Sequence, residues 1–240
     1  MDKQTRKRHL MIKEPVLLPE ILIIIFLFAM LLIAVINMRK TRNLADCRKI
    51  NRFPRISVLV PARNEEDKIG PCVKSLLAQD YPDFQVIVLN DNSTDRTGEI
   101  LQTLARNDSR LKVIQGNYLP PDWLGKHWAC HQLYREADGD LLIFTDADTV
   151  HTPNTLCCTS AALQEDKADM LSIIPRHTLG SWAEKLVMPY FALGVFAVVP
   201  LPKRLRPKKS YLSSSGKLLA FSRHAYEKCG GFEAIRMNVL

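Results

Sequence analysis

Residues 55–66 read RISVLVPARNEE, and this stretch decides the fold class. Its first half, RISVLV, is short, rich in β-branched residues and ended by Pro61, as expected for a buried strand. The second half is polar, and the residues that follow, from about Glu66 to Gln79, have a helical pattern. A buried strand that passes through a polar turn into a helix indicates the start of a β–α–β unit.

The same order recurs along most of the chain. Strands are expected at 85–89, 111–114, 141–145 and 170–174, and helices at 94–106, 126–137 and 154–166. The segment SSSG at 213–216 is expected to be a loop that leads into a further strand. Strands that alternate with helices form a mostly parallel sheet with helices on both faces, so the predicted fold class is α/β.

Polar clusters follow three of the expected strands. They read PARNEE at 61–66, NDNSTD at 90–95 and DADT at 146–149. Ligands of open α/β sheets bind beyond the carboxyl ends of the strands, where these clusters should meet. The sequence therefore predicts a binding site at this edge of the sheet.

Taken singly, the clusters leave alternatives open. Asp91 could accept N–H bonds from a nucleobase, but NDNSTD is also typical of a turn in which Ser93 or Thr94 caps the next helix. Asp146 and Asp148 are two residues apart and could share Mg²⁺ or Mn²⁺ with a diphosphate. Capping of a helix ahead of Pro153 is the alternative there.

Taken in order, the clusters resemble the motifs of the family 2 glycosyltransferases of the GT-A fold, from about Arg55 to Phe232. Two more segments extend the resemblance. WLGK at 123–126, followed by Ala129, is similar to a WxGK segment of membrane-associated members, and GGFE at 230–233 is similar to their acceptor-side GGF motif. The expected architecture is a GT-A domain, which is Rossmann-like with a mostly parallel sheet and helices on both faces, behind an N-terminal transmembrane helix.

The resemblance implies a site for a nucleotide-diphosphate sugar and a divalent metal, Mn or Mg. The residues it assigns to the donor nucleotide are Pro61, Ala62, Arg63, Asn64, Glu65, Asp91, Lys126 and Asp146, and those it assigns to the metal are Asp148 and Asp146. Cleavage of the anomeric C–O bond leaves negative charge on a nucleoside diphosphate, which a cation and nearby donors must stabilise. Lys126, at a helix start, could contact a phosphate or could be an ordinary solvated residue.

Transfer with inversion also needs a base that takes the proton of the acceptor hydroxyl. Members of the family usually carry this carboxylate in an ED or TED motif several residues beyond GGF, whereas here the sequence stops at Leu240. Glu233 is the only acid of the tail and matches the ordinary FE of the GGF motif. We therefore expect no catalytic residue in this stretch and a base beyond Leu240, with the chain a fragment, a truncated product or a donor-binding protein.

Residues 16–36 are expected to be a transmembrane anchor. They are apolar except for Pro19 and Glu20, and at about 1.5 Å per residue they reach roughly the 30 Å of a bilayer core. A cleaved signal peptide is the alternative, but the apolar run is long for one and no small-x-small pattern follows it. Basic residues are more numerous after the run, so the positive-inside rule favours a cytoplasmic C-terminal part and a single-pass protein of the cell membrane.

The expected organisation is a basic segment at 1–15, the anchor at 16–36, a basic linker at 37–54 and a GT-A domain, incomplete at its C-terminus, at 55–240. The net charge of +8 gathers beside apolar segments, which favours an anionic membrane surface, and no nucleic-acid motif accompanies it. We expect no nucleic-acid partner. The six cysteines show no CxxC pair and are expected to be reduced.

Two further features have weaker expectations. The apolar segment 186–201 is broken by Pro189, Gly194 and Pro200 and precedes KRLRPKK at 203–209, which favours an interfacial segment near a lipid acceptor over a core helix. His127 and His131 lie four apart on an expected helix, but no third ligand completes a metal site.

The expected function is metal-dependent, inverting transfer of a sugar, with a UDP-sugar favoured as donor, to a lipid or membrane-delivered acceptor. The stretch PPDWLGK at 120–126 also looks like that of members acting on carotenoid-type or hopanoid-type lipids. The alternative is a catalytically silent protein that binds nucleotide sugar or serves as a scaffold. A nucleotidyltransferase is disfavoured because no glycine-rich phosphate loop follows the first strand.

Overall fold

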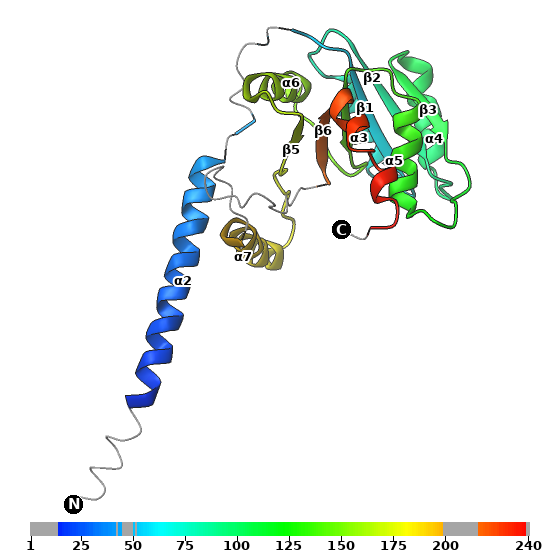
Figure 1. Ribbon diagram of the computed structural model, residues 1–240. Coiled ribbons are helices and arrows are strands. Elements are labelled where there is room, and N and C mark those ends of the chain that lie inside the picture. The colour runs from blue at the N-terminus through cyan, green and yellow to red at the C-terminus, as the bar shows by residue number, and fades with distance from the viewer. Residues whose placement is uncertain (1–13, 42, 45–49, 51, 199–215, 239–240) are drawn as a thin grey trace, which may run out of the picture. The chain divides into compact units, whose positions relative to one another are not determined.

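The structure is a computed structural model that describes residues 14–41, 43–44, 50, 52–198 and 216–238 (Figure 1). Its contacts divide the chain into two compact units. The helix unit comprises Met1–Arg42 and His177–Ser213, and the sheet unit comprises Asn43–Arg176 and Ser214–Leu240. KRLRPKK at 203–209 lies outside the described residues.

The sheet unit is built on six strands in the order β3-β2-β1-β4-β6-β5. Their bounds are β1 Ile56–Ala62, β2 Phe84–Asn90, β3 Leu111–Gln115, β4 Leu141–Thr145, β5 Met170–Ser172 and β6 Leu218–Ser222. The first four strands are parallel, and β6 runs antiparallel to both β4 and β5. The expected strands and the mostly parallel α/β sheet are confirmed. The sequence did not indicate that the last strand inserts between β4 and β5.

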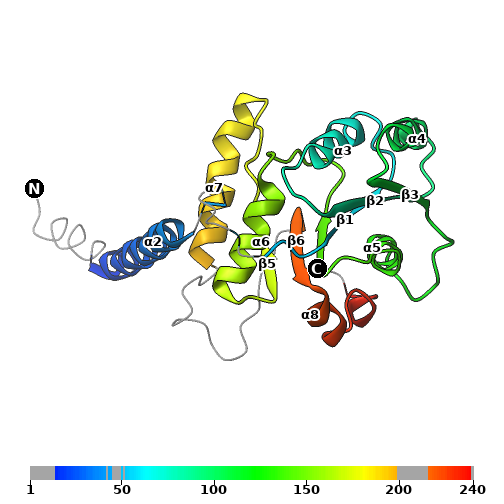
Figure 2. The ribbon, with the colours of Figure 1, turned by 90° about the horizontal axis from the view of Figure 1, so that it is seen from above.

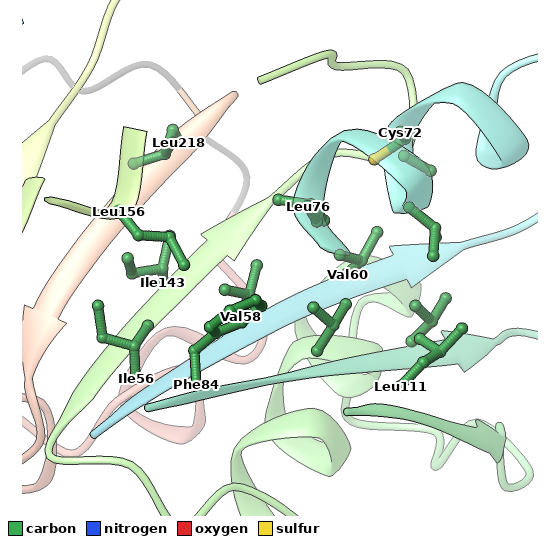
Figure 3. Close-up of a cluster of buried hydrophobic side chains, with 14 of the residues drawn as sticks. Ile56, Val58, Val60, Cys72, Leu76, Phe84, Leu111, Ile143, Leu156 and Leu218 are labelled. Carbon is green, nitrogen blue, oxygen red and sulfur yellow. The ribbon is translucent and has the colours of Figure 1, made fainter. Parts of the chain in front are cut away.

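Helices cover both faces of this sheet (Figure 2). One face carries α3 Ile69–Leu77, α4 Thr97–Asn107 and α6 Thr155–Asp166; the other carries α5 Gly125–Arg135, α8 Arg223–Lys228 and the short 3₁₀ helix η2 Glu233–Ile235. Because successive strand residues point to opposite faces of the sheet, one strand contributes side chains to two cores. Val58 and Val60 enter the first core, shown in Figure 3, and Leu59 between them enters the second.

The helix unit contains α2 Glu14–Lys40 and α7 Trp182–Val198. Within α2, Leu18–Arg39 is the one described segment that is long and apolar enough to cross a membrane. The two helices pack through small residues, since Ala34 is fully buried, and the Asn37 side chain donates a hydrogen bond of 2.6 Å to the Phe196 carbonyl. Tyr190 and Phe191 of α7 remain largely exposed.

The expectation that all cysteines are reduced is wrong. Cys72, Cys130, Cys157 and Cys229 are free thiols, but Cys158, buried on α6, is in a disulfide. The lack of a CxxC pair does not exclude a bond between cysteines that are distant in sequence, because the fold decides which thiols meet.

Candidate functional site

The three polar clusters meet at one edge of the sheet unit, around a cavity of about 340 Å³. The residues that line it are Pro61, Ala62, Arg63, Glu65, Asp91, Gly125, Lys126, Ala129, Asp146, Ala147 and Asp148. The parallel pairing of β1 with β2 and with β4 brings their carboxyl ends together, so each cluster supplies part of one wall. Of the residues assigned from sequence, Asn64 is the one that is not among the lining residues.

Asn64 instead joins the first cluster to the second. Its side-chain oxygen accepts a hydrogen bond of 2.8 Å from the Thr94 N–H, and its own N–H donates to the Ser93 hydroxyl at 3.0 Å. Asn64 has a positive φ of 55°, which Asn tolerates better than most residues. The two turns are therefore held together by the side chains of Asn64 and Ser93.

These bonds correct the expected start of the second helix. Ser93 and Thr94 face the first cluster and do not cap α4, whose N-cap residue is Arg96, without a side-chain cap. The first helix also begins later than expected, at Ile69, because the Glu66 N–H donates to Asp95 at 3.1 Å. Bonds between the two turns thus replace one helical turn on each side.

Asp91 lines the cavity from the second cluster. Its side chain is 19% exposed, and the nearest Arg63 guanidinium nitrogen is 3.8 Å from its carboxylate. The Asp91 N–H donates to the Ala62 carbonyl at 2.8 Å. A Cβ on Gly116 would lie 3.1 Å from one Asp91 carboxylate oxygen and 3.2 Å from the Asp91 Cα, so a larger residue there would require Asp91 to shift.

The acidic pair Asp146 and Asp148 is neutralised by two lysines. Lys126 Nζ lies 2.6 Å from one Asp146 oxygen and Lys217 Nζ lies 3.3 Å from the other. Lys217 Nζ also lies 2.8 and 2.7 Å from the two oxygens of Asp148. Burial alone would raise the pKa of Asp148, but the hydrogen bond and charge of Lys217 outweigh it, so the pKa lies below its usual value.

The arrangement of these two carboxylates fits a cation. Both turn oxygens toward one point, and the Lys217 ammonium marks that point. The described residues contain no group of three or more His, Cys, Asp or Glu side chains that could hold a metal. A divalent cation held here would therefore take its other oxygen ligands from a bound diphosphate and from water, which is common for Mg²⁺.

Lys217 is the residue of this site that sequence reasoning missed. It immediately precedes β6, and the hydroxyl of Thr145 on β4 donates to its carbonyl at 2.7 Å. Because β6 is antiparallel to β4, the start of β6 lies beside the end of β4, where the acids are. The sequence shows that Lys217 follows the expected SSSG loop, but it does not show that the next strand pairs with β4.

A second cavity of about 350 Å³ adjoins the first and shares Pro61, Lys126 and Asp146 with it. Its other lining residues are His127, Cys130, Phe144, Thr145, Gly216, Leu219 and Phe232. Most of these are apolar or aromatic, whereas the first cavity is lined by acids and bases. The two cavities therefore offer one charged and one largely apolar compartment on either side of Asp146.

Phe232 of the GGF segment lines this second cavity. Gly230 and Gly231 have φ values of 79° and 53°, which suit glycine, and a Cβ on Gly231 would lie 2.5 Å from the Tyr226 ring. This tight turn places the Phe232 ring 5.1 Å from Phe144 and 5.6 Å from His127, centroid to centroid. The GGF and WLGK segments are thus neighbours, as the 2.9 Å bond from the Leu124 N–H to the Arg236 carbonyl also shows.

His127 and His131 do not form a pair of ligands. His127 is buried against Phe232, and its Nδ1 has no hydrogen-bond partner. His131 packs between Trp123 and Trp128, with ring centroids 4.8 and 5.7 Å away. Burial lowers the pKa of His131 and is the main cause of its shift.

Solved structures with this fold are glycosyltransferases of the GT-A class. The mannosyltransferase PcManGT from Pyrobaculum calidifontis, in complex with GDP-Man and Mn²⁺, superposes with a TM-score of 0.63 at 24% identity, over 85% of this chain and 55% of that one. S. aureus TarS in complex with UDP superposes with a TM-score of 0.53 at 24% identity, over 77% of this chain and 52% of that one. The sheet unit therefore has the GT-A fold.

The model of the family described as glycosyl transferase family 2 matches residues 57–236, and the chain belongs to this family. A beta-monoglucosyldiacylglycerol synthase of Nostoc sp. is 28% identical over 75% of this chain and 38% of its own length. A 4,4'-diaponeurosporenoate glycosyltransferase of Staphylococcus aureus is 29% identical over 72% of this chain and 48% of its own length. The chain thus spans less than half the length of these curated relatives.

Proposed function

We propose that this chain carries the donor-binding half of a membrane-bound glycosyltransferase, which moves a sugar from a nucleotide-diphosphate donor to a lipid acceptor with inversion. The observation that carries the proposal is the meeting of the three strand-end clusters in one cavity, which Asp91 and the acidic pair Asp146 and Asp148 all line. A charged cavity beside a largely apolar one suits a charged nucleotide donor that meets an apolar lipid acceptor.

The nucleoside would lie against the first two clusters. Asp91 is only partly exposed, so its carboxylate can accept N–H bonds from a base with little competition from water. Arg63 and Glu65 line the same wall, and the bonds of Asn64 to the second cluster hold that wall in place. The proposed role of Asn64 is therefore to position the nucleotide-binding loop.

The diphosphate would lie beside Lys126, Asp146 and Asp148. A divalent cation held by the two carboxylates would stabilise the negative charge of the leaving nucleoside diphosphate. Lys126, in the first turn of α5, supplies a further positive charge at the same place. The Mn²⁺ bound with GDP-Man in PcManGT supports a metal in this role.

The sugar and the incoming acceptor hydroxyl would occupy the second cavity, against Phe144 and Phe232. Aromatic rings commonly offer an apolar face to a bound ligand and leave orientation to a few polar groups. Glu233 lines neither cavity, so we do not assign it the role of base. We assign no base among the residues that line the two cavities.

The membrane location is supported by the helix unit. The span Leu18–Arg39 exposes nearly all of its apolar side chains, which in water would be unfavourable. We propose that α2 crosses the membrane and that α7 lies at its surface with Tyr190 and Phe191 toward lipid. The larger basic flank after α2 favours the cytoplasmic side for the sheet unit, whereas the disulfide of Cys158 is more typical of an oxidising compartment.

The names of relatives support a lipid acceptor. Those relatives are named as a beta-monoglucosyldiacylglycerol synthase and a diaponeurosporenoate glycosyltransferase, and both acceptors implied by these names are apolar molecules. A membrane-bound chain would meet such acceptors directly. The acceptor class proposed for this chain is therefore a membrane lipid with a free hydroxyl or carboxyl group.

The donor site is tested by calorimetric titration of UDP with Mn²⁺ into the full chain in detergent micelles. Asp146→Asn together with Asp148→Asn should weaken binding about 100-fold, or about 2.7 kcal/mol. Asp83→Asn is the matched control, because Asp83 pairs with Arg55 outside the cavity and its loss should leave the affinity unchanged. A folded wild-type chain that binds neither UDP nor GDP would rule out the donor site.

The same samples separate an enzyme from a silent binding protein. Transfer of labelled sugar from a UDP-sugar to lipid extract would support the enzyme. Binding of the donor without transfer would favour the silent alternative.

The anchor is tested by extraction of membranes with alkaline carbonate. Phe26→Arg with Phe28→Arg places two charges in the middle of α2, each costing about 2.5–3.5 kcal/mol in a bilayer, and should release the chain into the soluble fraction. Tyr118→Arg, a change at a residue that is 90% exposed in the sheet unit, should leave the chain in the membrane. Retention of the α2 variant would contradict a spanning α2.

A further inference from the structure

We propose that the Lys217 ammonium is a built-in cation of the acidic pair, so that a divalent metal binds Asp146 and Asp148 strongly only when a donor diphosphate draws Lys217 away. The inference rests on the proposed donor site. It makes metal and donor bind cooperatively and gives Lys217 the role of coupling them.

The fold itself delivers Lys217 to the acids. In the antiparallel register of β4 and β6, Thr145 is paired with Leu218, so the residue before Leu218 lies beside the turn that carries the acids. The Thr145 hydroxyl also donates to the Lys217 carbonyl at 2.7 Å, which fixes the backbone there. The Lys217 ammonium therefore reaches the acidic pair from a strand end that is fixed by the pairing with β4 and by the Thr145 hydroxyl.

Every oxygen of the acidic pair contacts an ammonium. Lys217 contacts both oxygens of Asp148, at 2.8 and 2.7 Å, and one of Asp146, at 3.3 Å. Lys126 contacts the remaining Asp146 oxygen at 2.6 Å. A Mg²⁺ or Mn²⁺ ion would need carboxylate oxygens at about 2.0–2.2 Å, so the ammonium that bridges the two acids must move first.

Charge balance favours the same order of events. Two carboxylates and two ammonium groups are neutral together, and a divalent ion added beside them would leave an excess positive charge in a half-buried site. A nucleoside diphosphate brings the missing negative charge. The flexible four-carbon stem of Lys217 lets its ammonium follow the phosphates.

The consequence is a linkage between two ligands. If UDP raises the affinity for Mn²⁺ by some factor, then Mn²⁺ must raise the affinity for UDP by the same factor. Removing the Lys217 charge should free the acids, tighten the binding of Mn²⁺ alone and shrink that factor. A chain regulated in this way holds metal firmly only when donor is present.

The test measures Mn²⁺ bound to the full chain in detergent micelles, from the paramagnetic resonance signal of free Mn²⁺, with and without UDP. For Lys217→Met we expect the affinity for Mn²⁺ alone to rise at least about tenfold. The enhancement by UDP should shrink by a similar factor but stay above unity, because the diphosphate oxygens would still bind the ion. Lys217→Arg keeps the charge and should behave like the wild type. The matched control is Lys112→Met, which removes an equally close ion pair, 2.7 Å to Glu136, away from the site.

An unchanged affinity for Mn²⁺ alone in Lys217→Met would overturn the inference, and so would equal enhancement by UDP in wild type and variant. If Lys217→Met does not fold, as judged by circular dichroism, the same Mn²⁺ titrations are made with Lys217→Gln, which removes the charge and keeps a polar group. A wild-type chain that binds Mn²⁺ but no UDP would overturn both the donor site and this inference. Normal UDP binding with no effect of Lys217→Met would overturn the inference alone.

Discussion

Large apolar side chains are buried in the sheet unit and exposed in the helix unit. Leu59 and Leu142 of the sheet are fully buried, whereas Ile24 and Phe28 of α2 are 65% and 66% exposed. In the sheet unit apolar burial stabilises the fold in water, and in the helix unit the exposed surface is available to a lipid solvent. The difference teaches that apolar content alone does not predict where a core lies, because the pattern along the chain decides which solvent a segment requires.

The largest expected effect separates the two units directly. Leu59→Ala removes a fully buried side chain and should lower the free energy of unfolding of the sheet unit by about 2–5 kcal/mol. Leu31→Ala changes a side chain of α2 that is 50% exposed, and it should alter the free energy of unfolding of the sheet unit by less than about 0.5 kcal/mol. Urea titration of the full chain in detergent, followed by the fluorescence of Trp123 and Trp128 with Trp182 replaced by Phe, measures both. Equal effects would mean that the units unfold together.

A pH titration sharpens the contrast through His151, a half-buried histidine of the sheet unit. Burial lowers the pKa of His151 to about 4, and its Nε2 lies 3.0 Å from the Thr149 hydroxyl. The unfolded chain binds this proton near pH 6.5 while the folded chain does not, so stability present above pH 6.5 is lost as the pH falls toward 4. The loss attributable to His151 should be roughly 2–3 kcal/mol.

The measurement is the slope of unfolding free energy against pH between 6.5 and 4, compared between wild type and variants. His151→Gln should flatten the slope even though it lowers stability at neutral pH. His177→Gln, a change at an exposed residue, should leave the slope as it is. An unchanged slope in His151→Gln would show that this histidine is not buried in the neutral form.

The smallest expected effect concerns two glycines, one in each unit. Gly231→Ala forces a side chain into a positive φ of 53° and against the Tyr226 ring, which should destabilise the sheet unit by about 1–3 kcal/mol. Gly194→Ala in α7 has nothing within 4 Å of the added carbon and should leave the sheet unit unchanged. Thermal unfolding in detergent compares them, and a neutral Gly231→Ala would mean that the GGF turn can relax.

Much of the proposed donor site could be predicted from sequence because its parts are local. Each cluster comes directly after a strand whose pattern is clear, and parallel pairing brings strand ends together whatever the side chains are. Asp91, Asp146 and Asp148 could therefore be assigned to one edge before the sheet order was known. The exact helix starts could not, because bonds between the first two clusters compete with the first turn of each helix.

Other features depend on partners that are distant in the chain. The pairing of α7 with α2 joins segments about 160 residues apart, as the bond between Asn37 and Phe196 shows. The disulfide of Cys158 likewise requires a second thiol brought near by folding. No local pattern carries this information, because such contacts are chosen by the packing of the whole unit.

The sequence by itself determined the α/β alternation, the apolar α2 and the three strand-end clusters, since each depends on the periodicity and turn chemistry of neighbouring residues. Only the tertiary structure decided that β6 lies between β4 and β5 and so carries Lys217 to the acidic pair. It also decided that Asn64 holds a loop together, away from the cavity wall. The physical reason is that strand order and side-chain direction follow from the free energy of the assembled sheet, in which residues far apart in sequence become neighbours.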